Sequence, residues 1–391
     1  MSHALFSLND DLKRLRNEGY LVQVVGGFLV MRNVPYVDKS REVRSGTLIS
    51  SLTLAGDQTR RPDTHVIHFD GEFPCTADGR PIEPIRHQSR YTDLGNGLAA
   101  KHSFSSKPEG GYVDYFHKMT TYAAILSGPA EVVDGHATPR TMKEPEAEEE
   151  SIFNYTETAS DRVGIGALSD LLKSDVVAIV GLGGTGGYVL DLVAKTPVSE
   201  IRLFDSDEFL QHNAFRAPGA ASIEELREVS KKVDYFEATY SKMHCGIIAC
   251  DEAMSATNLD KLDGVTFAFL SMDAGEEKRL VVEKLEAIGA SFIDVGMGLE
   301  LDEGSLGGIL RVTTSTPDMR DHVHNGRVSF SGGGEKDLYS SNIQVADLNA
   351  LNAVLAVVKW KKLRGFYRDL EQEHHCTYTT DGNMLLNGDT K

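Results

Sequence analysis

Residues Val176 to Arg216 constrain this chain more than any other stretch, because an apolar strand, a glycine-rich turn and an acid follow one another there at fixed spacing. The run 176–180 is wholly apolar and predicts a parallel strand buried on both faces. Five glycines crowd the run 181–187, and we expect a helix to begin at about Tyr188. Such a turn lets phosphate approach the backbone and the N–H groups of a helix N-terminus. The stretch therefore predicts a nucleotide site in an α/β domain.

Asp205 follows the next expected strand, 201–204, and lies 24 residues after Gly181. An acid at this distance is typical of a dinucleotide site, where it accepts hydrogen bonds from ribose hydroxyls. An NAD-dependent oxidoreductase is therefore one alternative. Asp207, Asn213 and Arg216 follow within eleven residues of Asp205, however, and an NAD enzyme does not need that cluster. The polar cluster favours a different nucleotide chemistry.

The order GxGGxG, then DxD at a strand end, then NxxR resembles the ThiF/MoeB/E1 superfamily of adenylyltransferases. The resemblance covers about residues 160–365. It implies a Rossmann-like domain with a mostly parallel sheet, which uses ATP and Mg²⁺ to adenylate a carboxylate. A lysine on the following helix and an aspartate after a later strand complete the family's site. Lys232 and Asp273 match them, and Lys232 fits better than the adjacent Lys231.

The resemblance also assigns expected roles. Gly183 and Gly184 leave the backbone open to phosphate or ribose, while Arg216 and Lys232 offset charge on the triphosphate. Asp273 is expected to hold Mg²⁺, a hard cation that prefers oxygen ligands; capping of the helix after it is the structural alternative. The nucleotide-binding residues implied are Gly181, Gly183, Gly184, Asp205, Asp207 and Asn213. The catalytic residues implied are Arg162, Arg216, Lys232 and Asp273.

Arg162 enters because members of the family are usually dimers, in which an arginine preceding the first strand reaches the ATP of the partner. Arg162 lies 19 residues before Gly181, a shorter spacing than is usual in the family. The resemblance thus implies a homodimer with a cationic finger at each site.

The composition excludes some classes of binding partner. The formal net charge is −18 and the pI is about 5.2, which argues against binding to nucleic acid or to a membrane surface. Four cysteines form no CxxC pair, so no zinc site is expected, although many relatives carry one. The first residues lack a basic segment followed by an apolar run, and no continuous apolar stretch approaches membrane-spanning length. We expect a cytoplasmic protein.

The acidic run from Lys143 to Glu150 cannot bury apolar surface and marks a linker. We therefore expect an N-terminal α+β domain over 1–142, a linker over 143–151 and the adenylation domain over 152–391. Helical spacing over 8–17, a hairpin turning at Gly26-Gly27, and strands at 47–52 and 65–69 follow in an order similar to E2-like and RWD-like domains. Cys75 is then either an E2-type thiol or a small buried residue.

Substrates of the family are small β-grasp, ubiquitin-like proteins that end in glycine. Gly296 and Gly298 end an apolar run and leave room for such an extended tail. A crossover loop is expected at about 311–342 and contains no cysteine. The candidate acyl acceptors are Ser329 and Ser331, activated by His322 or His324, and Cys376 in a C-terminal tail. Helical spacing over 342–358, with Trp360 beyond, predicts a long helix that is either core or a dimer seam.

The resemblance is nearest to bacterial E1-like enzymes that attach a separate domain to a ThiF unit, often in antiphage (antiviral) defence. The predicted function is ATP-dependent activation of the C-terminal glycine of a ubiquitin-like protein, with an E2-like protein as a further candidate partner. Adenylation of a sulfur-carrier protein, a peptide or a tRNA-linked carboxylate stays open. A noncatalytic pseudo-E1 scaffold is the alternative outside enzymes.

Overall fold

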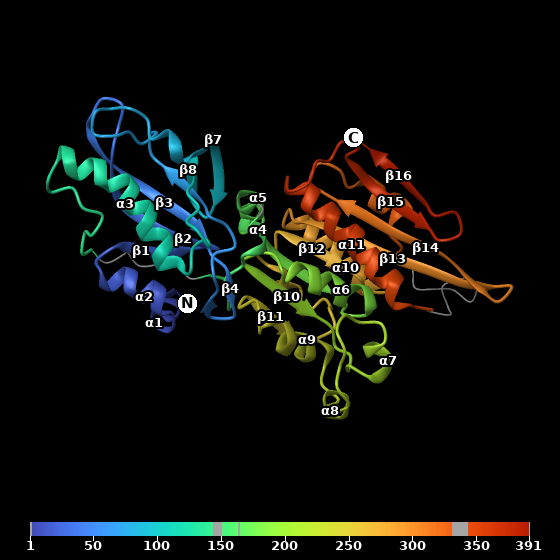
Figure 1. Cartoon of the computed structure of the whole chain (residues 1–391). Helices are drawn as coiled ribbons and strands as arrows, with labels where there is room; N and C mark the ends of the chain where they lie inside the picture. The colour runs from blue at the N-terminus through green and yellow to red at the C-terminus, as the bar shows by residue number, and fades with distance from the viewer. Residues whose placement is uncertain (1, 144–150, 163–164, 331–342, 391) are drawn as a thin grey trace. The chain divides into compact units, whose positions relative to one another are not determined.

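A computed structural model describes residues 2–143, 151–162, 165–330 and 343–390 (Figure 1). The chain forms two compact units, Met1–Asp170 and Leu171–Lys391. No helix among the described residues is long and apolar enough to cross a membrane.

The first unit is built on an antiparallel sheet with strand order β1-β2-β3-β6-β8-β7. Helix α3 (Tyr115–Val133) packs against β2 and β3, and the core lies between this helix and the sheet. The sheet strands are β1 (Leu21–Val25), β2 (Phe28–Val37), β3 (Val43–Ser51), β6 (Val66–Asp70), β7 (Arg86–Gly95) and β8 (Leu98–Ser105). Two-residue strands β4 (Leu54–Ala55) and β5 (Gln58–Thr59) pair separately. The remaining helices are α1 (Ser2–Leu8), α2 (Asp10–Asn17), α4 (Ala159–Arg162), α5 (Gly166–Asp170) and the 3-10 turn η1 (Glu83–Ile85).

The expected hairpin about Gly26-Gly27 is confirmed, and so are strands within 47–52 and 65–69. The helix expected over 8–17 is α2, which begins at Asp10. A separate helix, α1, ends at Leu8, and Asn9 lies between the two, where its side-chain amide donates to the carbonyl of Leu5. Cys75 is buried, and burial raises the pKa of its thiol above the ordinary value. A buried thiol of this kind is a packing residue rather than a reactive nucleophile.

The two units divide after Asp170, later in the chain than the acidic segment at 143–151. Helix α5 accounts for the difference, since it packs against β7 and belongs to the first unit. Asp170 accepts a hydrogen bond from the backbone N–H of Asn96 at 2.7 Å, and Gly95 lies directly against the backbone of Gly166.

The second unit is built on a mixed sheet with strand order β11-β10-β9-β12-β13-β14-β15-β16. The first five strands in that order are parallel, and the last four, β13 included, form an antiparallel extension. The strands are β9 (Val176–Val180), β10 (Glu200–Phe204), β11 (Ile247–Cys250), β12 (Phe267–Leu270), β13 (Ser291–Asp302), β14 (Ser305–Ser315), β15 (Glu373–Thr379) and β16 (Met384–Thr390). The expected α/β class is thus confirmed for this unit.

Helices cover both faces of the parallel part. Val177 and Ile179 of β9 pack with α6, α9 and α11 on one face, and Ala178 and Val180 pack with α10 on the other. This alternation explains why β9 is apolar throughout. The helices and turns are α6 (Gly184–Val193), α7 (Gln211–Ala214), α8 (Ile223–Glu228), α9 (Lys232–Tyr240), η2 (Leu259–Leu262), α10 (Glu276–Ala287), η3 (Val323–Arg327) and α11 (Ala346–Leu363).

Four expectations need correction. Helix α6 begins at Gly184 rather than at about Tyr188, so the glycines form its first turn. Helix α11 begins at Ala346 and includes Trp360, which is fully buried in the core. Cys376 lies in β15 and pairs with Val312 of β14 instead of lying in a tail. The predicted crossover loop overlaps β14, so within the described residues it can begin only after Ser315.

Candidate functional site

A cavity of about 820 Å³ opens at the carboxyl ends of the parallel strands of the second unit. Strand β9 lies between β10 and β12, and Val180 is in register with Phe204 on one side and Leu270 on the other. The residues after these strands therefore come together, although they are far apart in the sequence. Open α/β sheets bind ligands at this edge, where the strand order changes direction.

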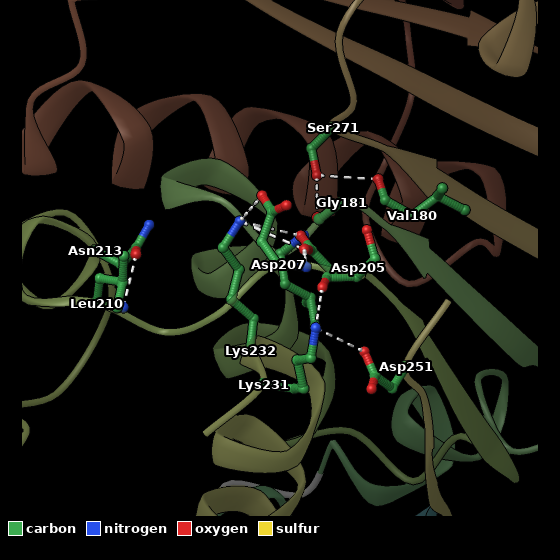
Figure 2. Close-up of polar contacts among 12 residues, drawn as sticks. Val180, Gly181, Asp205, Asp207, Leu210, Asn213, Lys231, Lys232, Asp251 and Ser271 are labelled. Atoms are coloured by element: carbon green, nitrogen blue, oxygen red, sulfur yellow. Dashed lines mark hydrogen bonds and ion pairs between the residues drawn. The ribbon is translucent and has the colours of Figure 1, made fainter. Parts of the chain in front are cut away.

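The turn after β9 requires glycine at Gly181 for two reasons. Its φ is +89°, and a Cβ placed there would lie 2.6 Å from the carbonyl oxygen of Ser271. Ser271 Oγ donates to the Gly181 carbonyl at 2.5 Å and so holds the turn against the end of β12 (Figure 2). Gly183 lines the cavity just before α6 begins, where backbone N–H groups without helical partners favour an anion.

Asp205 follows β10 and is fixed by two backbone donors. Its Oδ2 accepts from the N–H of Leu182 at 2.6 Å, and its Oδ1 accepts from the N–H of Asp207 at 2.9 Å. The carboxylate is therefore tied to the glycine turn while one side of it faces the cavity.

Lys232 lies at the start of α9 and its side chain is only 8% exposed. Its Nζ lies 2.7 Å from Asp207 Oδ2 and 3.4 Å from Asp205 (Figure 2). Lys231 points elsewhere: its Nζ donates to the carbonyl of Ser206 at 2.7 Å and lies 3.7 Å from Asp251. Lys232 is therefore the lysine that meets both acids, and the side chain of Asp207 is 71% exposed.

Asn213 and Arg216 reach the cavity from the segment around α7. Asn213 is buried, and its Oδ1 accepts from the backbone N–H of Leu210 at 2.9 Å, which fixes the start of the helix. Arg216 Nη1 donates to Gln344 Oε1 at 3.2 Å. Arg216 Nε is buried and has no hydrogen-bond partner within the part of the chain that the structure describes. The guanidinium thus keeps donor capacity for another group.

Asp273 follows β12 and is exposed in the cavity wall. No hydrogen bond or ion pair holds its carboxylate among the described residues, and Gly275 is the residue that caps α10. The capping role that the sequence left open for Asp273 is therefore absent here. Its carboxylate is free to accept a cation such as Mg²⁺, whose other ligands are commonly phosphate oxygens and water.

Gly184 is not one of the residues that line the cavity. Gly184 is buried behind its wall and packs against Asn349 of α11. Arg162 lies in α4 of the first unit, and its side chain is outside the described part of the chain. These two positions stay predictions.

The candidate acyl acceptors also stay predictions. Ser329 is exposed, and no hydrogen bond to His322 or His324 is present among the described residues. Ser331 lies outside the described residues. Burial is the main cause that raises the pKa of Cys376, which disfavours its thiolate.

Several cavity residues were not predicted from the sequence. Ser271 could have been noticed as the polar residue directly after β12, in the position that Asp205 has after β10. Gln344, the partner of Arg216, had no such signal, because it lies 128 residues farther along the chain.

Comparison with known proteins finds one matching domain model and several similar proteins. Residues 10–158 match a domain of unknown function, DUF6791. Over 121 residues, 30% of this chain and 26% of the relative, the sequence is 27% identical to ubiquitin-like modifier-activating enzyme 5 of Culex quinquefasciatus. The chain thus spans about a quarter of that enzyme's length. This match confirms the resemblance to E1-like enzymes that the motifs predict.

Solved structures are similar as well. The crystal structure of PaaA aligns with 59% of this chain and 77% of its own length, at 19% identity and a TM-score of 0.46. The structure of Escherichia coli MccB with ATP aligns with 59% of this chain and 71% of its own length, at 18% identity and a TM-score of 0.45.

Proposed function

We propose that the second unit is an E1-like adenylyltransferase, which uses ATP and Mg²⁺ to activate the C-terminal glycine carboxylate of a ubiquitin-like protein. The observation that supports this most is that one cavity is lined by Asp205, Asn213, Arg216, Lys232 and Asp273. Adenylation joins a carboxylate oxygen to the α-phosphorus of ATP and releases pyrophosphate. The reaction therefore needs positioning and positive charge more than proton transfer.

The side chains suit those tasks. Asp205 is fixed by the N–H groups of Leu182 and Asp207 and keeps acceptor capacity for the ribose hydroxyls. The open N-terminus of α6, after Gly183, offers backbone donors to phosphate. Asn213 holds the turn that presents Arg216 to the cavity.

Lys232 and Asp207 form an ion pair that a triphosphate would rearrange. Because Asp207 is largely exposed while Lys232 is buried, the carboxylate can turn into water and leave the ammonium to phosphate. Arg216 supplies a second cation, and its unpartnered Nε suits an anionic acceptor. Asp273 would hold Mg²⁺, which when bound offsets charge on the triphosphate and the departing pyrophosphate.

The protein substrate is proposed from the similarity to a ubiquitin-like modifier-activating enzyme. The predicted extended tail would run beside Gly296 of β13, and the Arg311 guanidinium, which packs against Gly296, would have to move to admit it. The rest of the proposal rests on the family resemblance alone. It comprises a homodimer with Arg162 as the finger, an E2/RWD-like partner-binding first unit, transfer to Cys376 or to Ser329 or Ser331, and a place in bacterial antiphage conjugation.

ATP–pyrophosphate exchange with the full chain and a glycine-tailed ubiquitin-like protein tests the proposal. We expect exchange that requires the partner and is lost in Asp273→Ala, whereas Asp260→Ala, an exposed acid outside the cavity, should exchange normally. Exchange with a sulfur-carrier protein or a peptide instead would change the substrate and keep the chemistry. ATP binding without exchange would favour a scaffold, and absence of ATP binding would overturn the proposal.

A further inference from the structure

Two asparagines lie on one face of α11, which packs against both the glycine-turn helix α6 and strand β13. Asn349 and Asn352 are fully buried, at 0% and 1% exposure. Their spacing of three residues places them on adjacent turns of the helix, within reach of each other. Amides rarely lie in a helix core unless their polar atoms are paired.

In each asparagine, only one of the two polar atoms of the side-chain amide has a hydrogen-bond partner among the described residues. Thr185 Oγ1, in the first turn of α6, donates to Asn349 Oδ1 at 2.9 Å. Asn352 Nδ2 donates to the carbonyl of Gly296 on β13 at 3.1 Å. Asn349 Nδ2 and Asn352 Oδ1 have no hydrogen-bond partner within the described residues, although both atoms are buried.

The two unpaired atoms are complementary, since one is a donor and the other an acceptor. A hydrogen bond between them would complete a chain from Thr185 through Asn349 and Asn352 to Gly296. Every donor in that chain points the same way, so each bond would polarise and strengthen the next. The open arrangement leaves two buried polar atoms unsatisfied, so a small shift that closes the chain is favourable.

The two ends of this series of hydrogen bonds lie at the proposed nucleotide site and at the proposed substrate site. Thr185 belongs to the helix turn that would bind phosphate, and Gly296 lies on the strand along which the substrate tail is proposed to run. Asn349 also touches the glycine turn directly, because a Cβ at Gly184 would lie 2.1 Å from Asn349 Nδ2. Movement of the first turn of α6 therefore must displace the Asn349 amide.

We propose that Asn349 and Asn352 are positioning residues that couple the nucleotide turn to β13, closing their shared hydrogen bond when nucleotide binds at the N-terminus of α6. This inference rests on the proposed function. Closure draws the Gly296 carbonyl toward α11 and orders the strand before the carboxylate arrives. Coupling of this kind is reciprocal, so an occupied tail site also tightens nucleotide binding.

Hydrogen exchange of the full chain, with and without Mg²⁺ and α,β-methylene-ATP, tests the coupling. In the wild type we expect the nucleotide to slow exchange both at the start of α6 and at Gly296–Gly298. In Asn352→Leu the nucleotide should still protect α6, and the protection at Gly296–Gly298 should be lost. Val354→Ala, on the exposed side of α11, is the matched control and should behave as the wild type does.

Thr185→Ala breaks the chain at its other end and should give the same loss, so the test survives if Asn352→Leu does not fold. Protection of α6 without any change at Gly296–Gly298 in the wild type would overturn the coupling and leave the proposed function standing. Protection at Gly296–Gly298 that persists in both variants would remove the asparagines from it. No nucleotide protection anywhere would overturn the proposed function and this inference together.

Discussion

Both units bury a lysine on a helix, and the two units treat that charge differently. In the second unit, Lys232 meets Asp207 and Asp205 at the cavity, and Lys278 of α10 lies 2.7 Å from the buried carboxylate of Asp294. In the first unit, Lys118 of α3 is fully buried, and its Nζ has no hydrogen-bond partner among the described residues. Burial lowers the pKa of Lys118 to about 8.

The difference shows that the role of a buried lysine depends on its partners and not on burial alone. A cation with a carboxylate partner stays charged and can act on an anionic ligand, whereas a cation without one gives up its proton more easily. Burial of a lysine is therefore a poor indication of function unless its hydrogen-bond and ion-pair partners are known.

The largest expected effect concerns Lys232. Lys232→Met should reduce ATP–pyrophosphate exchange by roughly a hundredfold or more, because the cation nearest the paired acids is removed from the proposed phosphate site. Lys231→Met should cost less, since that side chain binds the Ser206 carbonyl. Equal losses in the two variants would contradict the assignment of Lys232.

The second prediction concerns stability. Lys278→Met should lower the free energy of unfolding of the second unit by roughly 3 kcal/mol, because Arg311 is the one ion-pair partner that Asp294 keeps among the described residues. Trp360, the one tryptophan in the sequence, is buried in this unit and reports its unfolding in urea. Lys284→Met on the same helix removes only the pair with the exposed Asp263 and should cost under about 1 kcal/mol. Similar costs in the two variants would argue against a special role for burial.

The third prediction is the opposite effect in the first unit: replacing its buried lysine, Lys118, should raise the free energy of unfolding. The folded pKa of Lys118, about 8, lies below the ordinary value of 10.5, so the unfolding free energy should rise as the pH increases from 8 to 10.5. Lys118→Met should remove this rise and stabilise the unit at pH 7 by about 3 kcal/mol. Hydrogen exchange of α3 measures both effects, with the exposed Lys101→Met as control. Destabilisation by Lys118→Met would show that the ammonium has a partner after all.

The smallest effect concerns His375 of β15, which is buried beside Thr313. Burial, with Arg327 and Arg311 nearby, lowers the pKa of His375 to about 4. The unfolded chain therefore takes up this proton first, and the second unit should lose stability as the pH falls from 6.5 to 4, by about 2 kcal/mol at pH 5. His375→Gln should reduce the change in the free energy of unfolding between pH 6.5 and pH 4, measured by urea unfolding followed through Trp360 fluorescence. If the variant loses as much stability at low pH as the wild type does, groups other than His375 cause that loss.

Much of the candidate site could be predicted because its motifs are local. A wholly apolar strand followed by glycines, and an acid directly after the next strand, placed Gly181 and Asp205 correctly at neighbouring strand ends. The start of α6 was missed because glycines disfavour helix, and here their close packing outweighs that preference. Cys376 was misplaced because β15 lies in the sheet between β14, about 60 residues earlier in the chain, and β16, and the pairing with β14 is not visible in the local sequence.

The sequence by itself determined the α/β class of the second unit, the glycine turn and the set of polar residues at the strand ends, because these follow from spacing along the chain. Only the tertiary structure decided which polar groups meet. Lys118 is buried with no hydrogen-bond partner among the described residues, and Asn349 and Asn352 face α6 and β13. Such pairings depend on the packing of residues far apart in the sequence, which no local pattern records.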